Sequence, residues 1–194
     1  MPGGFYMIKD VVVYGVINDY KNRSQPSFID LETAKSNMKY IPGCIGVMSM
    51  DRTFYYVTDG KWADMAPYPG IITYLKDSKR SIEIIRGYFN QVSKNPGIQK
   101  LINEGKIRKF NGLFAVSGAT VIGTTCVESQ FRDMESGVRW LLSNKKAAAI
   151  ESHLPAYISK CEPVARIDVD PRNPTVSYFV ENPKNEKLLL TWIK

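Results

Sequence analysis

Few side chains in this sequence could act as a nucleophile or a general base, and they lie far apart. The only histidine, His153, lies in an apolar-flanked segment, and the sequence contains no Gly-x-Ser-x-Gly turn. A Ser-His-Asp hydrolase needs a histidine base held against its serine, and a nucleophilic Cys126 or Cys161 would need the same base. The sequence therefore predicts no catalytic residues and favours a protein that is not an enzyme.

Ligands for a metal or a cofactor are equally sparse. Asp168 and Asp170 would share one face of a strand, a spacing that suits a cation or acid-base work, but an aspartate before Pro171 is also typical of a turn. The glycines of segment 118–123 lack the Gly-Lys-Ser/Thr ending of a phosphate-binding loop and the spacing of a dinucleotide fingerprint. We therefore predict no metal site and no cofactor.

The cysteines and the apolar runs give expectations about compartment. Cys44, Cys126 and Cys161 are odd in number, widely spaced and without a Cys-x-x-Cys pair, which predicts free thiols and synthesis in a reducing, intracellular compartment. The longest apolar runs, such as 11–17, are shorter than the ~20 residues of a membrane-spanning helix. The first residues also lack the basic and apolar regions of a signal peptide. We therefore expect no membrane span.

Positive charge is concentrated in one segment. The formal net charge is +7, and residues 76–109 contain nine basic residues against three acidic ones. Such a cluster could bind nucleic acid phosphates, with Tyr88 and Phe110 stacking on bases. The alternative is a solvated surface that partners in an assembly neutralise. The candidate contacts of either kind are Lys79, Arg80, Arg86, Lys106, Arg108 and Lys109.

Strand and turn patterns are densest near the amino-terminal end, in an expected β-rich region over residues 1–66. A β-branched strand is predicted over 5–17, and Asp30 is placed to cap a helix over 31–38. A three-stranded meander should follow over 43–65, turning at Asp51-Arg52 and at a tight Asp59-Gly60 turn, with its third strand starting at Trp62. Pro67-Tyr-Pro-Gly70 marks the expected end of this region.

Residues 67–194 should form a second, mixed region. The overall prediction is an α+β fold in which antiparallel meanders near both ends flank a helical middle. The expected elements are helices over 79–104, interrupted at Asn95-Pro96, a hairpin over 107–116 around Asn111-Gly112, a third strand over 119–127, helix over 129–153, and a carboxy-terminal three-stranded meander over 156–169, 175–180 and 187–193.

One stretch resembles a known family. Ser27-Phe-Ile-Asp-Leu-Glu-Thr-Ala-Lys35, Ile45-Gly-Val47 and Tyr55-Tyr-Val-Thr-Asp-Gly-Lys-Trp62 are similar to a small module of tailed-bacteriophage virion proteins, notably fibres and adsorption proteins. In that module a helix start precedes a meander that ends in an aromatic hairpin. The resemblance covers residues 27–65 and implies a place in the virion.

These patterns predict a structural or assembly subunit of a tailed-phage particle, such as a fibre, head-decoration or tail-associated protein. It would bind copies of itself and other virion proteins through strand edges that need covering. Tyr55, Tyr56 and Trp62 are candidate interface aromatics for a subunit contact or a glycan surface, although they could equally fill the core. A basic nucleic-acid-binding protein is the first alternative, and an enzyme with scattered catalytic residues is the second.

Overall fold

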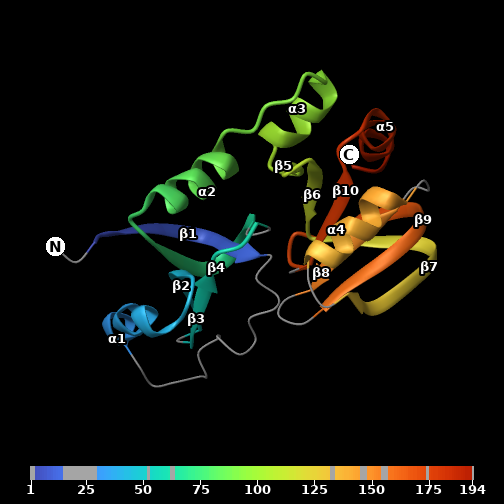
Figure 1. Ribbon diagram of the computed structural model, residues 1–194. Coiled ribbons are helices and arrows are strands. Elements are labelled where there is room, and N and C mark those ends of the chain that lie inside the picture. Colours follow the sequence, from blue (N-terminus) through green and yellow to red (C-terminus); the bar gives the residue numbers. More distant parts are fainter. Residues whose placement is uncertain are drawn as a thin grey trace. The chain divides into compact units, whose positions relative to one another are not determined.

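The computed structural model describes residues 3–14, 30–51, 53–61, 64–131, 134–144, 148–153, 157–173 and 175–193 (Figure 1). These residues form helices and two antiparallel sheets, so the predicted α+β class is confirmed. The chain divides into two compact units, unit 1 (Met1–Phe89) and unit 2 (Asn90–Lys194), which are described separately. Within the described ranges, no helix combines the length and the apolar character that crossing a membrane requires.

Unit 1 is built on a four-stranded antiparallel sheet with the strand order β1-β4-β2-β3. Its strands are β1 (Phe5–Tyr14), β2 (Cys44–Met50), β3 (Thr53–Thr58) and β4 (Asp64–Lys76). Its helices are α1 (Leu31–Asn37), the short 3-10 helix η2 (Met38–Tyr40) and α2 (Lys79–Phe89).

The long strand β4 passes through the two prolines that the sequence predicts as the end of the region. Its register against β1 shifts between Lys9 and Val11, and there Asp10 has a φ of 58° and accepts a hydrogen bond from the Gly70 N–H at 2.9 Å. Pro69 lies in the bulge, where backbone groups are left out of the ladder, and Pro67 pairs with Val11 of β1 outside the described ladder between β4 and β2, so neither proline interrupts the strand. The predicted boundary at residues 66/67 is therefore wrong, and unit 1 extends to Phe89.

The prediction of an amino-terminal meander is also wrong for the third strand. β2 and β3 form the predicted hairpin, but β4 pairs with β1 and β2 and has no pairing with β3 among the described residues. Thr73 and Leu75 of β4 pair with residues of both β1 and β2, and both are fully buried, as expected for a central strand. Gly60 does not have the positive φ of a primed turn. Trp62, the predicted start of the third strand, lies outside the described residues.

Helix α1 begins as predicted. The Asp30 side chain accepts a hydrogen bond from the Thr33 N–H at 2.7 Å, which satisfies one of the free amides of the first turn. With η2, the helix packs its buried side onto one face of the sheet. The buried residues of this contact are Ala34, Met38, Cys44, Val47 and Tyr56.

Helix α2 packs against β4. The Ser78 hydroxyl accepts a hydrogen bond from the Ser81 N–H at 3.1 Å, which satisfies one of the free amides of the first turn. The helix buries Ser81 and Ile84 and leaves Phe89 63% exposed. The Phe89 side chain therefore lies off the buried side of the helix.

Unit 2 contains a six-stranded antiparallel sheet with the order β5-β6-β10-β8-β9-β7. Its strands are β5 (Arg108–Phe110), β6 (Leu113–Ser117), β7 (Ala119–Phe131), β8 (Ala149–His153), β9 (Tyr157–Val169) and β10 (Val176–Val180). Its helices are α3 (Pro96–Asn103), α4 (Met134–Ser143) and α5 (Pro183–Trp192). The core on the sheet includes Ile98 and Leu101 of α3, Leu189 of α5 and Ile193, which follows α5.

Two local predictions for unit 2 are confirmed. Phe110 pairs with Leu113 across a turn in which Asn111 and Gly112 have φ values of 47° and 80°, as an Asn-Gly primed turn requires. Asn95 caps α3 by accepting from the N–H of Gly97, and a proline occupies the first helical turn. Short-range chemistry decides both features, so the sequence is sufficient to find them.

Three longer-range predictions for unit 2 are wrong. The segment 149–153, predicted as helix, forms β8, because it lies between β9 and β10 and pairs with both. The segment 187–193, predicted as a strand, lies almost entirely in α5, whose start Asn182 caps by accepting from the Asn185 N–H. The carboxy-terminal meander therefore does not form. β7 likewise pairs with β9 instead of extending the hairpin.

At one edge of this sheet, a side-chain amide forms hydrogen bonds with backbone groups of the edge strand β5. Gln91 precedes α3, and its Oε1 accepts from the Lys109 N–H at 2.5 Å while its Nε2 donates to the Lys109 carbonyl at 3.2 Å. The amide of Gln91 thus bonds β5 as a neighbouring strand would. Gln99 supports this segment by accepting from the Ser93 N–H at 2.7 Å.

The opposite edge strand, β7, curls over the sheet and is held by buried side chains. Ser177, Glu151 and Ser159 are paired neighbours on β10, β8 and β9, so they form one row on the same face. Glu151 accepts from the Val121 N–H, and the Ser177 hydroxyl donates to the Ala119 carbonyl at 2.8 Å. All three row residues are buried. Buried polar side chains therefore satisfy the backbone of an edge strand.

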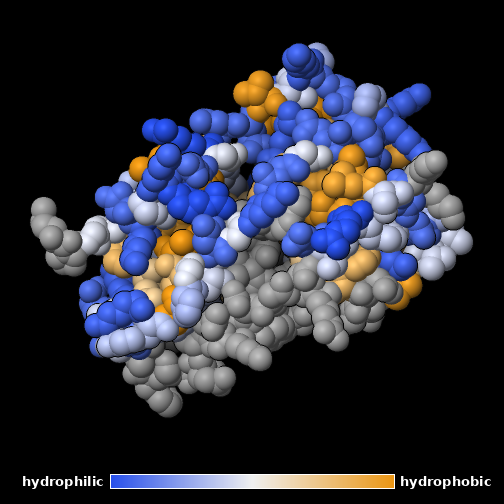
Figure 2. Space-filling model, in the orientation of Figure 1, coloured by the Kyte–Doolittle hydropathy of each residue, from blue (hydrophilic) through white to orange (hydrophobic). Residues whose placement is uncertain are grey.

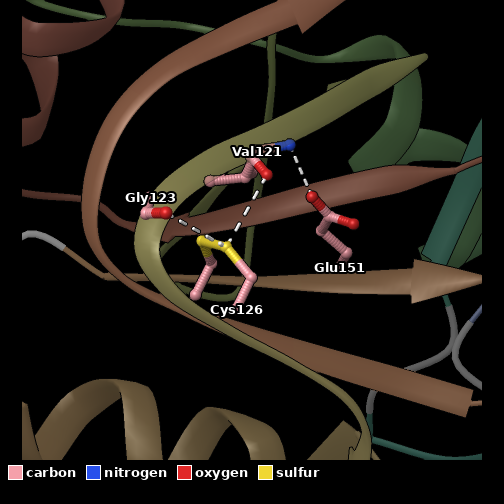
Figure 3. The surroundings of a disulfide bond; sticks show 5 residues. Val121, Gly123, Cys126 and Glu151 are labelled. Carbon is pink, nitrogen blue, oxygen red and sulfur yellow. Dashed lines mark hydrogen bonds between the residues drawn. A yellow bond between two sulfur atoms is a disulfide. The ribbon is translucent and has the colours of Figure 1, made fainter.

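A disulfide joins the two long strands in the same region (Figure 3). Cys126 of β7 pairs directly with Cys161 of β9, which the sequence could not show because their proximity comes from strand register. The approach is close: a Cβ at Gly123 would lie 2.7 Å from the Cys161 sulfur. The prediction of free thiols is wrong for this pair and holds for Cys44 alone among the described cysteines.

We predict that Glu151→Ala destabilises unit 2 by about 1–3 kcal/mol, because it leaves the buried Val121 N–H without its acceptor. Glu151→Gln keeps a carbonyl oxygen and should cost less. Urea unfolding followed by circular dichroism measures both. Glu135→Ala is the matched control, since its carboxylate is 70% exposed and pairs with Arg139 on the helix surface. Equal stability of the Ala variant and this control would contradict the role assigned to Glu151.

We predict that the unfolded, unreduced chain has one reactive thiol and that the reduced chain has three. Thiol titration in denaturant measures both numbers, and Cys44→Ser should abolish the unreduced signal. Burial raises the pKa of the Cys44 thiol, so alkylation of the native chain should be slow at neutral pH and accelerate as the pH rises. Three thiols before reduction would contradict the disulfide.

Candidate functional site

A groove with a volume of about 610 Å³ lies in unit 1, where the beginning of β1 and the end of β4 meet α1 and η2. Phe5 and Met38 contribute apolar surface to it, and Lys35, Lys39 and Lys76 are its basic residues. Figure 2 shows an apolar area between the beginning of β1 and α1, bordered by hydrophilic side chains. We refer to this feature as the basic groove.

The helical wall of the basic groove follows from residue spacing. Glu32, Lys35, Ser36 and Lys39 all line it, and their separations of three and four residues place them along one side of a helix. Met38 lies on the side that packs into the core and is 2% exposed. The Asp30 cap determines where the helix begins, so it positions this wall.

Strand register builds the opposite wall. Phe5 of β1 pairs with Lys76 of β4, so the two side chains share a face of the sheet. Tyr74 lies on the same face, two residues before Lys76. The Lys35 ammonium spans the two walls, 4.9 Å from the centre of the Phe5 ring and 5.2 Å from that of Tyr74. Such cation-π contacts hold the lysine over the aromatic floor.

The charges of the basic groove are only partly paired. Lys35 forms an ion pair with Glu32 at 3.0 Å, and the Tyr6 hydroxyl donates to Asp77 at 2.8 Å. That hydrogen bond raises the pKa of Tyr6, so the phenol stays protonated at neutral pH. Within the described part of the chain, no carboxylate forms an ion pair with Lys39 or Lys76. The groove therefore offers two ammonium groups beside an apolar floor.

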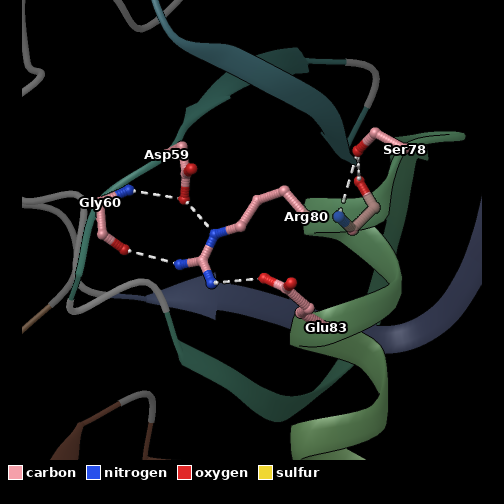
Figure 4. A network of polar contacts seen from close by, with 6 residues as sticks. Asp59, Gly60, Ser78, Arg80 and Glu83 are labelled. Atoms are coloured by element: carbon pink, nitrogen blue, oxygen red, sulfur yellow. Dashed lines mark hydrogen bonds and ion pairs between the residues drawn. The ribbon is translucent and has the colours of Figure 1, made fainter.

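The basic residues singled out from the sequence are divided between the units. Lys79, Arg80 and Arg86 lie on α2, and Arg80 is engaged within unit 1 (Figure 4). Its Nε donates to Asp59 at 2.7 Å and a terminal nitrogen donates to the Gly60 carbonyl at 3.0 Å, which fastens the connection after β3 to the helix. Arg80 therefore has a structural role in this unit.

The unit 2 residues are engaged as well. Lys109 pairs with Glu181 at 2.8 Å and donates to the Val92 carbonyl at 2.9 Å, while Lys106 lies 3.2 Å from Glu104. Arg108 is buried, with 6% of its surface exposed. Neither unit alone brings the six candidate residues onto one surface. Nucleic acid binding by this segment stays a prediction.

The candidate aromatic residues do not form one patch. Tyr55 and Tyr56 are consecutive in β3, so they point to opposite faces of the sheet. Tyr56 is 8% exposed and packs in the core under α1, and Tyr55 is half-buried. Trp62 lies outside the described residues. The interpretation in which these aromatics fill the core therefore applies to Tyr56.

The residues considered for catalysis or metal binding belong to unit 2. Asp168 lies 3.4 Å from Arg166, and Asp170 pairs with Arg172 at 3.3 Å. Hydrogen bonds from the Arg172 backbone and side chain lower the pKa of Asp170, so it is ionised at neutral pH. In the described ranges, no three histidine, cysteine, aspartate or glutamate side chains are grouped to hold a metal. The His153 side chain is not described.

None of the residues of the basic groove was among the candidates predicted from the sequence. The residues of its helical wall nevertheless have a spacing that could have indicated them. The spacing of residues 32, 35, 36 and 39 predicts a common helix side, whereas the strand half depends on pairing between residues 5 and 76. Local sequence patterns do not predict pairing between residues that lie this far apart in the sequence.

Comparisons with protein-family models, with curated proteins and with solved structures find no match to this chain. Its function is therefore inferred from the residues and the geometry described above.

Proposed function

We propose that this chain is a non-enzymatic structural or assembly subunit of a tailed-bacteriophage virion and acts through contacts with other virion proteins and with copies of itself. The observation that carries the proposal is the basic groove. One of its walls is α1, which lies in the stretch that resembles the virion module. The described residues of that stretch form α1, η2, β2, β3 and the first residues of β4.

The strand edge of unit 1 supports a role in assembly. Among the described residues, β3 has β2 as its only strand partner and is an edge of the four-stranded sheet. An edge strand presents backbone groups that pair readily with another chain. Protein contacts at this edge would bury it.

The disulfide supports a protein that functions outside a reducing compartment. Disulfides persist in oxidising surroundings, which include the surfaces of virions. The Cys126–Cys161 pair is compatible with synthesis in the host cytoplasm and oxidation after release of the particle. It adds a covalent link between β7 and β9 in a particle that must survive outside the cell.

We predict that the chain is present in purified particles of the tailed phage or prophage whose genome encodes it. Mass spectrometry of density-purified particles, beside the unfractionated lysate, measures this. Light scattering of the purified chain should also show an oligomer. Detection of the chain in the lysate but not in the particles would contradict a virion role. A monomer that binds no particle component would remove the support for assembly.

A further inference from the structure

We propose that the basic groove binds an acidic peptide segment of a partner protein, one that carries an apolar side chain between its carboxylates. This inference rests on the proposed function, because it names the chemistry of the partner in an assembly contact. The groove belongs entirely to unit 1, so the inference needs no assumption about unit 2.

The lysines of the groove are complementary to an acidic segment. Lys35 already has Glu32 as a partner, but Lys39 and Lys76 lie on opposite walls and have no carboxylate partner among the described residues. The Lys39 ammonium lies 4.9 Å from the centre of the Tyr40 ring, and that ring is 72% exposed. Two carboxylates of one extended segment could each meet an ammonium group across the groove.

The floor of the groove calls for an apolar side chain. Phe5 is half-buried, so an aliphatic or aromatic side chain placed between the lysines would remove the exposed part of its ring from water. Free phosphate or another small anion would leave this surface unused. The occupant should therefore be amphipathic as well as acidic.

The carboxylates in the walls favour a peptide over a nucleic acid. The Glu32 side chain is 81% exposed, and Asp77 lies on the opposite wall, so a continuous phosphate chain would pass two negative groups. Nucleic acid affinity comes from many phosphates meeting cations in sequence. A peptide can place carboxylates beside the lysines and amide or basic groups beside Glu32 and Asp77.

The test is fluorescence anisotropy with the full-length chain. The probe is a fluorescein-labelled peptide of aspartate and glutamate with one central phenylalanine, and an oligothymidylate of the same length is the second probe. Lys39→Glu with Lys76→Glu should weaken peptide binding by about tenfold or more. Lys94→Glu with Lys187→Glu is the matched control, because it changes the net charge equally at lysines of unit 2. It should leave the affinity unchanged.

Circular dichroism and unfolding midpoints verify that the variants fold. If the charge reversal unfolds unit 1, Lys39→Gln with Lys76→Gln keeps most of each stem and should still weaken binding by about threefold or more. Replacing the central phenylalanine of the probe by serine should also weaken binding, since it removes the group that meets the floor. Unchanged affinity after that replacement would contradict the role of Phe5.

Three outcomes would overturn the inference: no peptide binding by the native chain, equal weakening by both pairs of substitutions, or tighter binding of oligothymidylate that the groove variant abolishes. The last would assign the groove to nucleic acid. Particle incorporation without peptide binding would contradict only the groove assignment. Peptide binding by a chain that is absent from particles would contradict only the virion role.

Discussion

The hydrogen bond between the Val121 N–H and the Glu151 carboxylate is the contact on which the form of unit 2 depends. Together with the bond from the Ser177 hydroxyl to the Ala119 carbonyl, it connects the beginning of the edge strand β7 to β8 and β10, in addition to the ladder between β7 and β9. Burying a carboxylate is costly unless its oxygens are hydrogen-bonded. The backbone donor meets that requirement, so the polar row and the curl of the sheet stabilise each other.

At both edges of the six-stranded sheet, side chains form hydrogen bonds with backbone groups of the edge strand. Gln91 bonds the N–H and the carbonyl of Lys109 on β5, and Glu151 with Ser177 bonds the backbone of β7. Edge strands whose backbone groups have side-chain partners are poor templates for another chain. In unit 1, β3 has a single strand partner among the described residues. This edge of unit 1 is therefore where we propose contacts with partners.

Local chemistry is readable from the sequence, and strand pairing is not. The cap at Asp30, the helix start at Asn95-Pro96 and the turn at Asn111 each depend on residues within a few positions, and the structure confirms all three. The composition of segment 149–153 permits helix as well as strand, and pairing on two sides decides for a strand. Disulfide formation between Cys126 and Cys161 follows from register in the same way.

The basic groove shows why a site of this kind lies beyond sequence reasoning. Its strand wall exists because Lys76 pairs with Phe5, and a slip of one residue would turn Lys76 toward the other face of the sheet. The extra residues of β4 before Ile72 are absorbed at the bulge that Asp10 fastens to Gly70. The bulge therefore allows the two halves of β4 to pair with β1 in different registers. The register on the Lys76 side of the bulge is the one that pairs Lys76 with Phe5 and places it beside the helical wall.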